Sequence, residues 1–149
     1  MNTPDKLKAF RNAAHQCAMQ MMENATYVLK ELPPVDMPEA IKAKTQTMCA
    51  SLIDTKHDII TELFELEKEA ETASASSHLI PHVDLIVKWL TETTREMCDV
   101  VGELCEASEQ DARFILGYML LSESAINVMN AFNPAADAAR AMKQETGTD

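Results

Sequence analysis

The pattern of apolar residues between Phe114 and Phe132 constrains the fold of this chain more than any other feature. One set of residues recurs at steps of four and three: Phe114, Tyr118, Leu121, Ala125, Val128 and Phe132. On an α-helix this spacing places the set along a single face. A second set, displaced by about 100° around the helix, consists of Ile115, Met119, Ser122, Ile126 and Met129. Because two adjacent faces are apolar, the sequence predicts a deeply buried helix whose remaining side meets water.

The composition favours helices throughout and a single domain. The chain has 149 residues, three glycines and 5% aromatic residues, which leaves little material for strands or tight hairpins. A chain of this length can form one sizeable core but not two. We therefore predict an all-α protein in which residues 1–149 form one helical-bundle domain.

Capping residues and prolines divide the chain into predicted helices over residues 3–32, 36–73, 77–106 and 108–132. Ser77 and Ser108 are the predicted caps of the third and fourth helices, and Pro134 ends the fourth. The ordered core then covers about residues 4–132, with a short helix at 133–145 and a tail at 146–149. Long helices joined by short connections predict an antiparallel up-down-up-down four-helix bundle with a short C-terminal extra helix.

The charge of the chain excludes some classes of partner. The formal net charge is −11 and the sequence has no basic run, so we expect no binding to nucleic acid. No stretch approaches the roughly 18 apolar residues of a membrane span, and the first residues lack the pattern of a secretory signal. We therefore expect a soluble, cytoplasmic protein that does not associate with membranes. Its isolated cysteines are expected to be free, reduced thiols.

The candidates for a metal site are Cys17, Cys49, Cys98 and Cys105. In an antiparallel bundle they fall within roughly 10 Å of one another in height, at a rise of about 1.5 Å per residue. Thiolates and thioethers bind Cu(I) and Zn, so a small-ligand or soft-metal bundle that uses core Cys and Met is one alternative function. The sequence has no Cys-x-x-Cys pair, and buried Cys commonly fills a core. We therefore predict no cofactor.

A short acidic motif gives a further alternative. Glu103 and Glu106, in the run from Gly102 to Ala107, resemble the Glu-x-x-Glu helix of the all-α nucleotide pyrophosphohydrolases. That family holds Mg²⁺ on carboxylates from two helices, so the resemblance implies a Mg-dependent hydrolase. The family carries Glu-x-x-Asp on the next helix, whereas Glu123 here is followed by Ile126 and Asn127. Solvated acidic faces are the preferred interpretation.

Lys56 breaks the apolar face of the second predicted helix, between Leu52, Ile59 and Leu63. The sequence therefore predicts a buried polar residue, and a buried ammonium needs a partner. Glu96 and Glu123 lie at the same predicted height and could supply one, and a bound anion is a further option. The preferred alternative is that the long side chain extends to the surface and keeps its charge in water, because this arrangement is commoner than a buried pair or a bound anion.

Apolar residues in excess of a four-helix core predict a surface for self-association. They are Leu85, Trp89, Val100, Leu116 and Leu120. Tryptophan is enriched at interfaces, and a two-fold dimer would bury these side chains against their own copy. In a competing arrangement, the short C-terminal helix folds over Trp89. Because no nucleophile-base pair, phosphate loop or complete metal set is visible, the preferred function is a non-enzymatic interaction or adaptor protein that forms a homodimer. A further protein partner stays open.

Overall fold

A computed structural model of the protein describes residues 3–72 and 76–145. Four long helices account for nearly all of them: α1 (Thr3–Glu31), α2 (Glu39–Thr72), α3 (Ile80–Gln110) and α4 (Ile115–Glu145). Two short 3₁₀ helices, η1 (Ser76–Leu79) and η2 (Ala112–Phe114), precede α3 and α4. The described ranges contain no strand, which confirms the predicted all-α class. The predicted tail at 146–149 lies outside the described residues.

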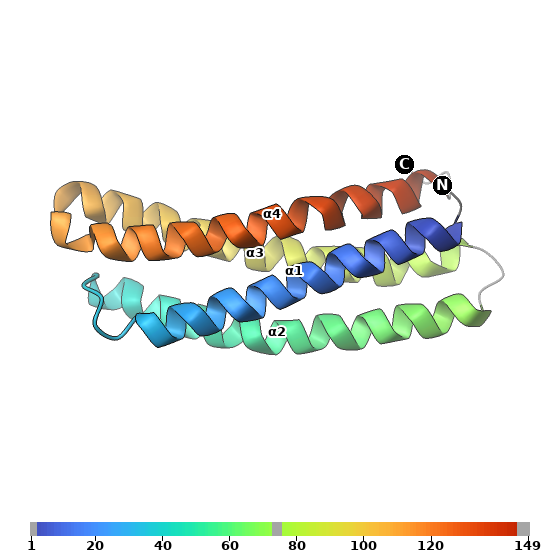
Figure 1. Ribbon diagram of the computed structural model, residues 1–149, viewed down its shortest axis with the longest axis horizontal. Coiled ribbons are helices and arrows are strands. Elements are labelled where there is room, and N and C mark those ends of the chain that lie inside the picture. The colour runs from blue at the N-terminus through green and yellow to red at the C-terminus, as the bar shows by residue number, and fades with distance from the viewer. Residues whose placement is uncertain (1–2, 73–75, 146–149) are drawn as a thin grey trace.

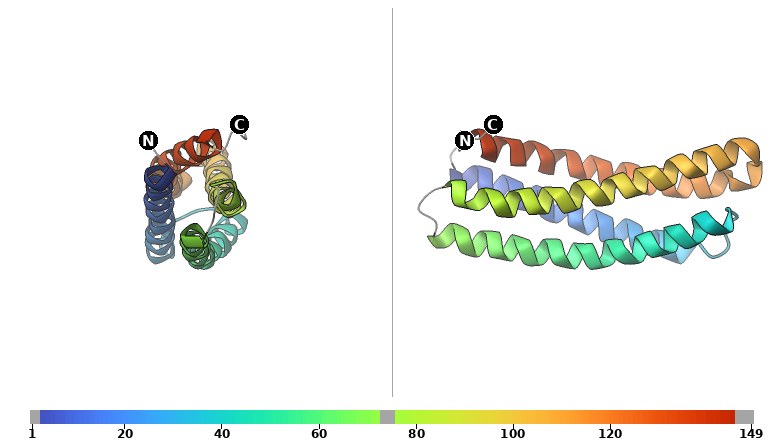
Figure 2. Two further views of the ribbon diagram at one scale, coloured as in Figure 1. Left: turned by 90° about the vertical axis from the view of Figure 1, so that its right-hand side faces the viewer. Right: turned by 180° about the vertical axis from the view of Figure 1, so that it is seen from behind.

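The four helices form an antiparallel bundle. Figure 1 shows successive helices running in opposite directions, so that both chain termini lie at the same end. The end-on view in Figure 2 shows the helices around a common axis. α1 packs mainly on α2 and α4, and α3 packs on the same two neighbours from the other side. The predicted up-down-up-down four-helix bundle is confirmed.

The buried side chains form one continuous cluster, and each helix contributes one face to it. On α1, the buried positions Phe10, Ala14, Cys17 and Met21 recur at steps of three and four residues, as expected for a helix with one face in a core. Among the described residues, the buried alanines all come from α1 and α4. These two helices also share the most extensive contact in the bundle, because small side chains let helix axes approach closely.

The separate C-terminal helix is a wrong prediction, because α4 continues through Pro134 to Glu145. A proline inside a helix removes one backbone hydrogen bond and crowds the carbonyl four residues earlier. Here the residues after the proline are buried: Ala135 and Met142 are at most 1% exposed and Ala139 is 4% exposed. Packing of this last segment against the bundle therefore outweighs the local cost of the proline.

Two predicted caps are also wrong. Ser77 lies inside η1, and α3 begins after Leu79, which gives it no side-chain cap; a proline occupies the first turn instead. The hydroxyl of Ser108 donates to the carbonyl of Cys105 at 2.8 Å, so it caps nothing. Asp111 has the capping role, because its carboxylate accepts a hydrogen bond from the backbone N–H of Arg113 at 3.0 Å. Two hydrogen bonds from Arg113, one from its guanidinium and one from its backbone N–H, lower the pKa of the Asp111 carboxyl. The bond from the guanidinium has the larger effect.

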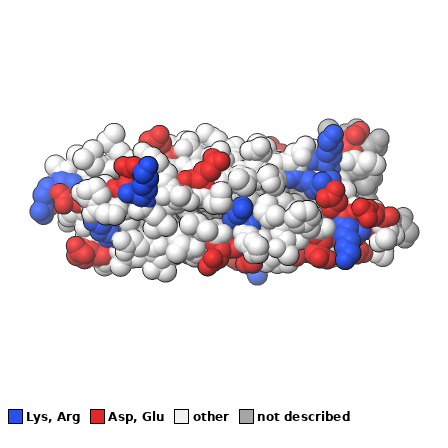
Figure 3. Space-filling view, turned by 60° about the horizontal axis from the view of Figure 1, so that its bottom comes forward, with Lys and Arg blue, Asp and Glu red and all other residues white. Residues whose placement is uncertain are grey.

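Within the described ranges, no helix combines the length and the apolar character needed to cross a membrane. On the face shown in Figure 3, lysines and arginines are interspersed with aspartates and glutamates and do not gather into a basic patch.

Candidate functional site

The outer side of α4 carries a row of exposed apolar side chains. Ile115, Met119, Ile126 and Met129 are exposed by 44%, 56%, 53% and 41%, and Leu116 beside them by 70%. With Ser122, which is half-buried, these residues define what we call the α4 stripe. The spacing of apolar residues in the sequence predicts that most of them lie on a buried face, and that prediction is wrong. α4 has α1 and α3 as its main neighbours, and these cover the first apolar face and leave the second in contact with solvent.

A hydrogen bond on the α1 side and a sulfur contact on the α3 side fix the rotation of α4 about its own axis. On the α1 side, the amide of Asn127 donates to the side-chain oxygen of Asn24 at 3.2 Å. Asn24 is only 7% exposed, and its own amide donates to the carbonyl of Gln20 at 2.7 Å. On the α3 side, the sulfur of Cys98 lies 3.6 Å from that of Met129. A rotation that buried the stripe would break the Asn24 contact and leave a buried polar group without its partner.

The α4 stripe lies in a segment almost without charge. Between Ile115 and Ala136 the only charged residue is Glu123, although the whole chain has a charge of −11. Interface cores are depleted of charged residues in the same way. The stripe is therefore suited to contact another uncharged apolar surface.

A shallow hollow of about 310 Å³ lies on the middle of the stripe, and its lining residues are Tyr118, Met119, Ser122, Glu123, Ile126 and Asn127. Positions 119, 122, 123 and 126 have the spacing i, i+3, i+4 and i+7. In coiled coils, four residues at this spacing form the hole that receives one side chain from a facing helix. The small side chain of Ser122 leaves the floor of this hole open.

The interface predicted from the sequence is not one continuous exposed surface. Val100 is 1% exposed and belongs to the core, so its assignment to a surface is wrong. Trp89 and Leu120 are half-buried and pack against the core, and Leu85 is also half-buried. The C-terminal part of α4 runs beside α3, where the ammonium of Lys143 lies 2.5 Å from a carboxylate oxygen of Asp84. Of the five residues, Leu116 alone is strongly exposed.

The cysteines do not form a metal centre. All four are free thiols, but Cys98 and Cys105 are half-buried, whereas Cys17 and Cys49 are buried. Burial raises the pKa of Cys17 from 9.0 to about 12 and that of Cys49 from 9.0 to about 11. Among the described residues, no three His, Cys, Asp or Glu side chains are arranged to hold a metal ion. Cys17 and Cys49 act as apolar core side chains.

The acidic motif on α3 is occupied by a lysine. The ammonium of Lys44 on α2 lies 2.7 Å from a carboxylate oxygen of Glu103, whereas Glu106 is exposed. The pKa of Lys44 is raised chiefly by its hydrogen bond to Glu103 and further by the charges of Glu103, Asp99 and Glu96, whereas desolvation lowers it. A hollow of about 580 Å³ between α2 and α3 borders these groups. The positive charge beside these carboxylates is the ammonium of Lys44. The arrangement therefore does not match a Mg²⁺ site on paired carboxylates.

Lys56 is half-buried, so its prediction as a buried residue is wrong. Among the described residues, no ion pair joins it to Glu96 or Glu123. The arrangement agrees with a side chain whose apolar stem packs on the helix and whose charge reaches solvent. A separate polar contact joins α2 and α3, in which Nδ1 of His82 lies 2.6 Å from a carboxylate oxygen of Glu62.

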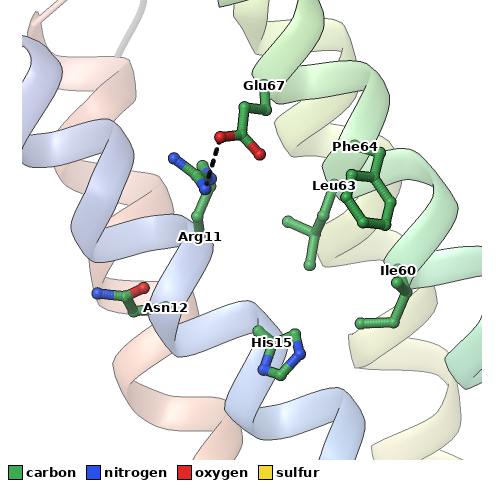
Figure 4. A pocket seen from close by; sticks show the side chains of 7 residues that line it. All are labelled: Arg11, Asn12, His15, Ile60, Leu63, Phe64 and Glu67. Carbon is green, nitrogen blue, oxygen red and sulfur yellow. Dashed lines mark ion pairs between the residues drawn. The ribbon is translucent and has the colours of Figure 1, made fainter.

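A third hollow, of about 220 Å³, lies between α1 and α2. Figure 4 shows its apolar wall of Ile60, Leu63 and Phe64, and the guanidinium of Arg11 directed at Glu67 across one end. That ion pair has a separation of 3.0 Å, so the only permanently cationic group of the hollow is already neutralised. Asn12 and His15 complete the lining. The lining of the hollow holds neither a nucleophile-base pair nor a group of metal ligands.

Comparisons of the chain with known protein families, with curated proteins and with solved structures found no match.

Proposed function

We propose that this protein is a non-enzymatic interaction protein that forms a homodimer through the α4 stripe. The observation that carries the proposal is the exposed apolar row on a helix segment with a single charged residue. Soluble proteins rarely leave such rows uncovered unless another molecule contacts them. The proposal keeps the self-association expected from the sequence, but its surface lies on α4 alone instead of on α3 and α4 together.

The charge of the chain favours a second copy as the partner. A basic partner would be attracted by acidic surfaces, and the stripe offers it only Glu123. An uncharged stripe is matched by another uncharged stripe, so neither copy leaves a charge buried without a partner. The rest of each copy is acidic, so two copies repel each other at long range. Added salt should therefore strengthen the association, whereas it would weaken binding to a basic partner.

The size of the stripe predicts a modest affinity. Its five large apolar side chains are about half exposed, so their burial contributes about 1 kcal/mol each, or about 10 kcal/mol for two copies. Association costs at least about 4 kcal/mol in lost freedom of motion. With this smallest cost, a binding free energy of about 6 kcal/mol remains, which corresponds to a dissociation constant of about tens of micromolar.

The proposal includes a cytoplasmic location. Four free thiols support it, because disulfides persist in oxidising compartments and are rare in the cytoplasm.

Sedimentation velocity at about 1 to 500 µM tests the proposal, since this range brackets the expected dissociation constant. The variant Ile126→Glu places a charge in the centre of the stripe, and Phe64→Glu is the matched control. Phe64 is exposed by 66% and lies on α2, outside the stripe. We expect the parent and Phe64→Glu to dimerise with rising concentration and Ile126→Glu to stay a folded monomer by circular dichroism. A monomeric parent at all concentrations, or a dimer unaffected by Ile126→Glu, would refute the proposal.

A further inference from the structure

The hollow on the α4 stripe has the form of a site for a single side chain from a facing helix. Met119, Ser122, Glu123 and Ile126 surround it at the spacing of a coiled-coil hole. A homodimer has a two-fold axis, so the side chain that enters the hollow must come from the stripe of the second copy. The relative direction of the two α4 helices then decides which side chain this is.

A parallel pair leaves the hollow empty. In a parallel two-fold pair each stripe residue faces itself, so Ser122 meets Ser122 and no large side chain reaches the floor of the hole. An antiparallel pair can instead set a large side chain against Ser122 of the partner subunit. Met119 is exposed by 56%, and its flexible, unbranched side chain adapts well to an irregular hollow.

We propose that the two α4 helices pack antiparallel, with Met119 of each copy inserted into the hollow of the other. This inference rests on the proposed homodimer. In the register that results, Met119 lies opposite Ser122 of the partner subunit, and Ile115 lies opposite Ile126 of the partner subunit. Met129 falls outside the central contact, in agreement with its lower exposure of 41% and its contact with Cys98.

The register also covers Leu116, which is exposed by 70%, more than any other large apolar side chain among the described residues. Leu116 and Glu123 lie on the same edge of the stripe, about 100° and 80° from Ile115 around the helix. In the antiparallel register, Leu116 of one copy lies about 3 Å in height from Glu123 of the partner subunit. The methylene groups of Glu123 can then pack over Leu116 while the carboxylate stays in water.

Cysteine pairing between separately prepared chains tests the register. In a background with Cys98→Ser and Cys105→Ser, one preparation carries Ile115→Cys and the other Ile126→Cys. The antiparallel register sets these two positions opposite each other, whereas the two copies of position 115 lie about 16 Å apart along the helix. A disulfide needs Cα atoms within about 7 Å. Ser51→Cys, an exposed position on α2, replaces Ile126→Cys in the collision control.

We expect a disulfide-linked dimer when the two preparations are mixed under mild oxidation, and none from either preparation alone or from the control mixture. Crosslinking of each single variant with itself would show a parallel pair and overturn the register. A dimer by sedimentation without a crosslink in the mixture would also overturn it and leave the proposed homodimer standing. A monomer by sedimentation refutes the homodimer and the register together.

Discussion

Two glycines in helices lie in opposite surroundings, and alanine substitutions at them should change stability in different directions. A Cβ atom added at Gly102 on α3 would meet no atom within 4 Å. Alanine there gains helix propensity and reduces the freedom of the unfolded chain, which together contribute about 1 kcal/mol. Gly102→Ala should therefore raise the free energy of unfolding by about 1 kcal/mol and the melting temperature by about 3 °C.

At Gly117 on α4, the same Cβ atom would lie 3.0 Å from the terminal methyl of Met37 and 3.4 Å from the backbone oxygen of Asp36. The connection between α1 and α2 passes against this glycine, and overpacking of a filled site costs about 1 to 3 kcal/mol. This cost offsets the gain in helix propensity, so Gly117→Ala should leave stability unchanged or lower it by up to about 2 kcal/mol.

Urea unfolding followed by circular dichroism measures both changes through the midpoint and slope. The reasoning is refuted if both substitutions stabilise the protein equally, since the packing of residues 35–37 on α4 would then not exist as described. A loss of stability in Gly102→Ala would equally contradict the open surroundings of that position.

Three further changes have expected outcomes. Pro134→Ala restores a backbone hydrogen bond within α4 and should raise the free energy of unfolding by about 2 kcal/mol, measured by urea unfolding; a loss would show that α4 is interrupted there. Burial raises the pKa values of Cys17 and Cys49, so the unfolded chain releases these two protons at a lower pH than the folded chain. The free energy of unfolding should therefore fall as pH rises above about 9. Cys17→Ala should make this fall with pH smaller. In the native protein these two thiols should react with a thiol reagent far more slowly than the other two. Lys56→Met should change stability by less than about 0.5 kcal/mol, because Lys56 is half-buried and has no ion pair with Glu96 or Glu123; a loss of several kcal/mol would reveal a buried charge pair.

The helices and their order could be predicted from the sequence, because apolar residues at steps of three and four fix which segments are helical. The orientation of α4 could not be predicted. Its two apolar faces have similar residue types, and the choice between them depends on α1 and α3. The contact between Asn24 and Asn127 is the clearest signal of the true orientation, but the two residues are 103 positions apart in the chain.

The site predictions failed for a related reason. Val100 and Leu116 both looked like surplus apolar residues in the sequence, yet one is buried and the other is exposed. The difference in exposure arises because a neighbouring helix covers Val100 and none covers Leu116. The local effect of Pro134 predicts a helix end, whereas burial of Ala135, Ala139 and Met142 keeps the helix continuous.

In the proposed homodimer, a second copy of the protein covers the α4 stripe. NMR spectra of protein labelled at the methionine methyl groups test it directly when recorded at increasing protein concentration. The account predicts that the signal of Met119 shifts with concentration, while the signals of Met21 and Met142, which are at most 1% exposed, stay constant. Ile126→Glu should abolish the shift. A Met119 signal that does not change up to about 500 µM, a concentration well above the expected dissociation constant, would contradict the account.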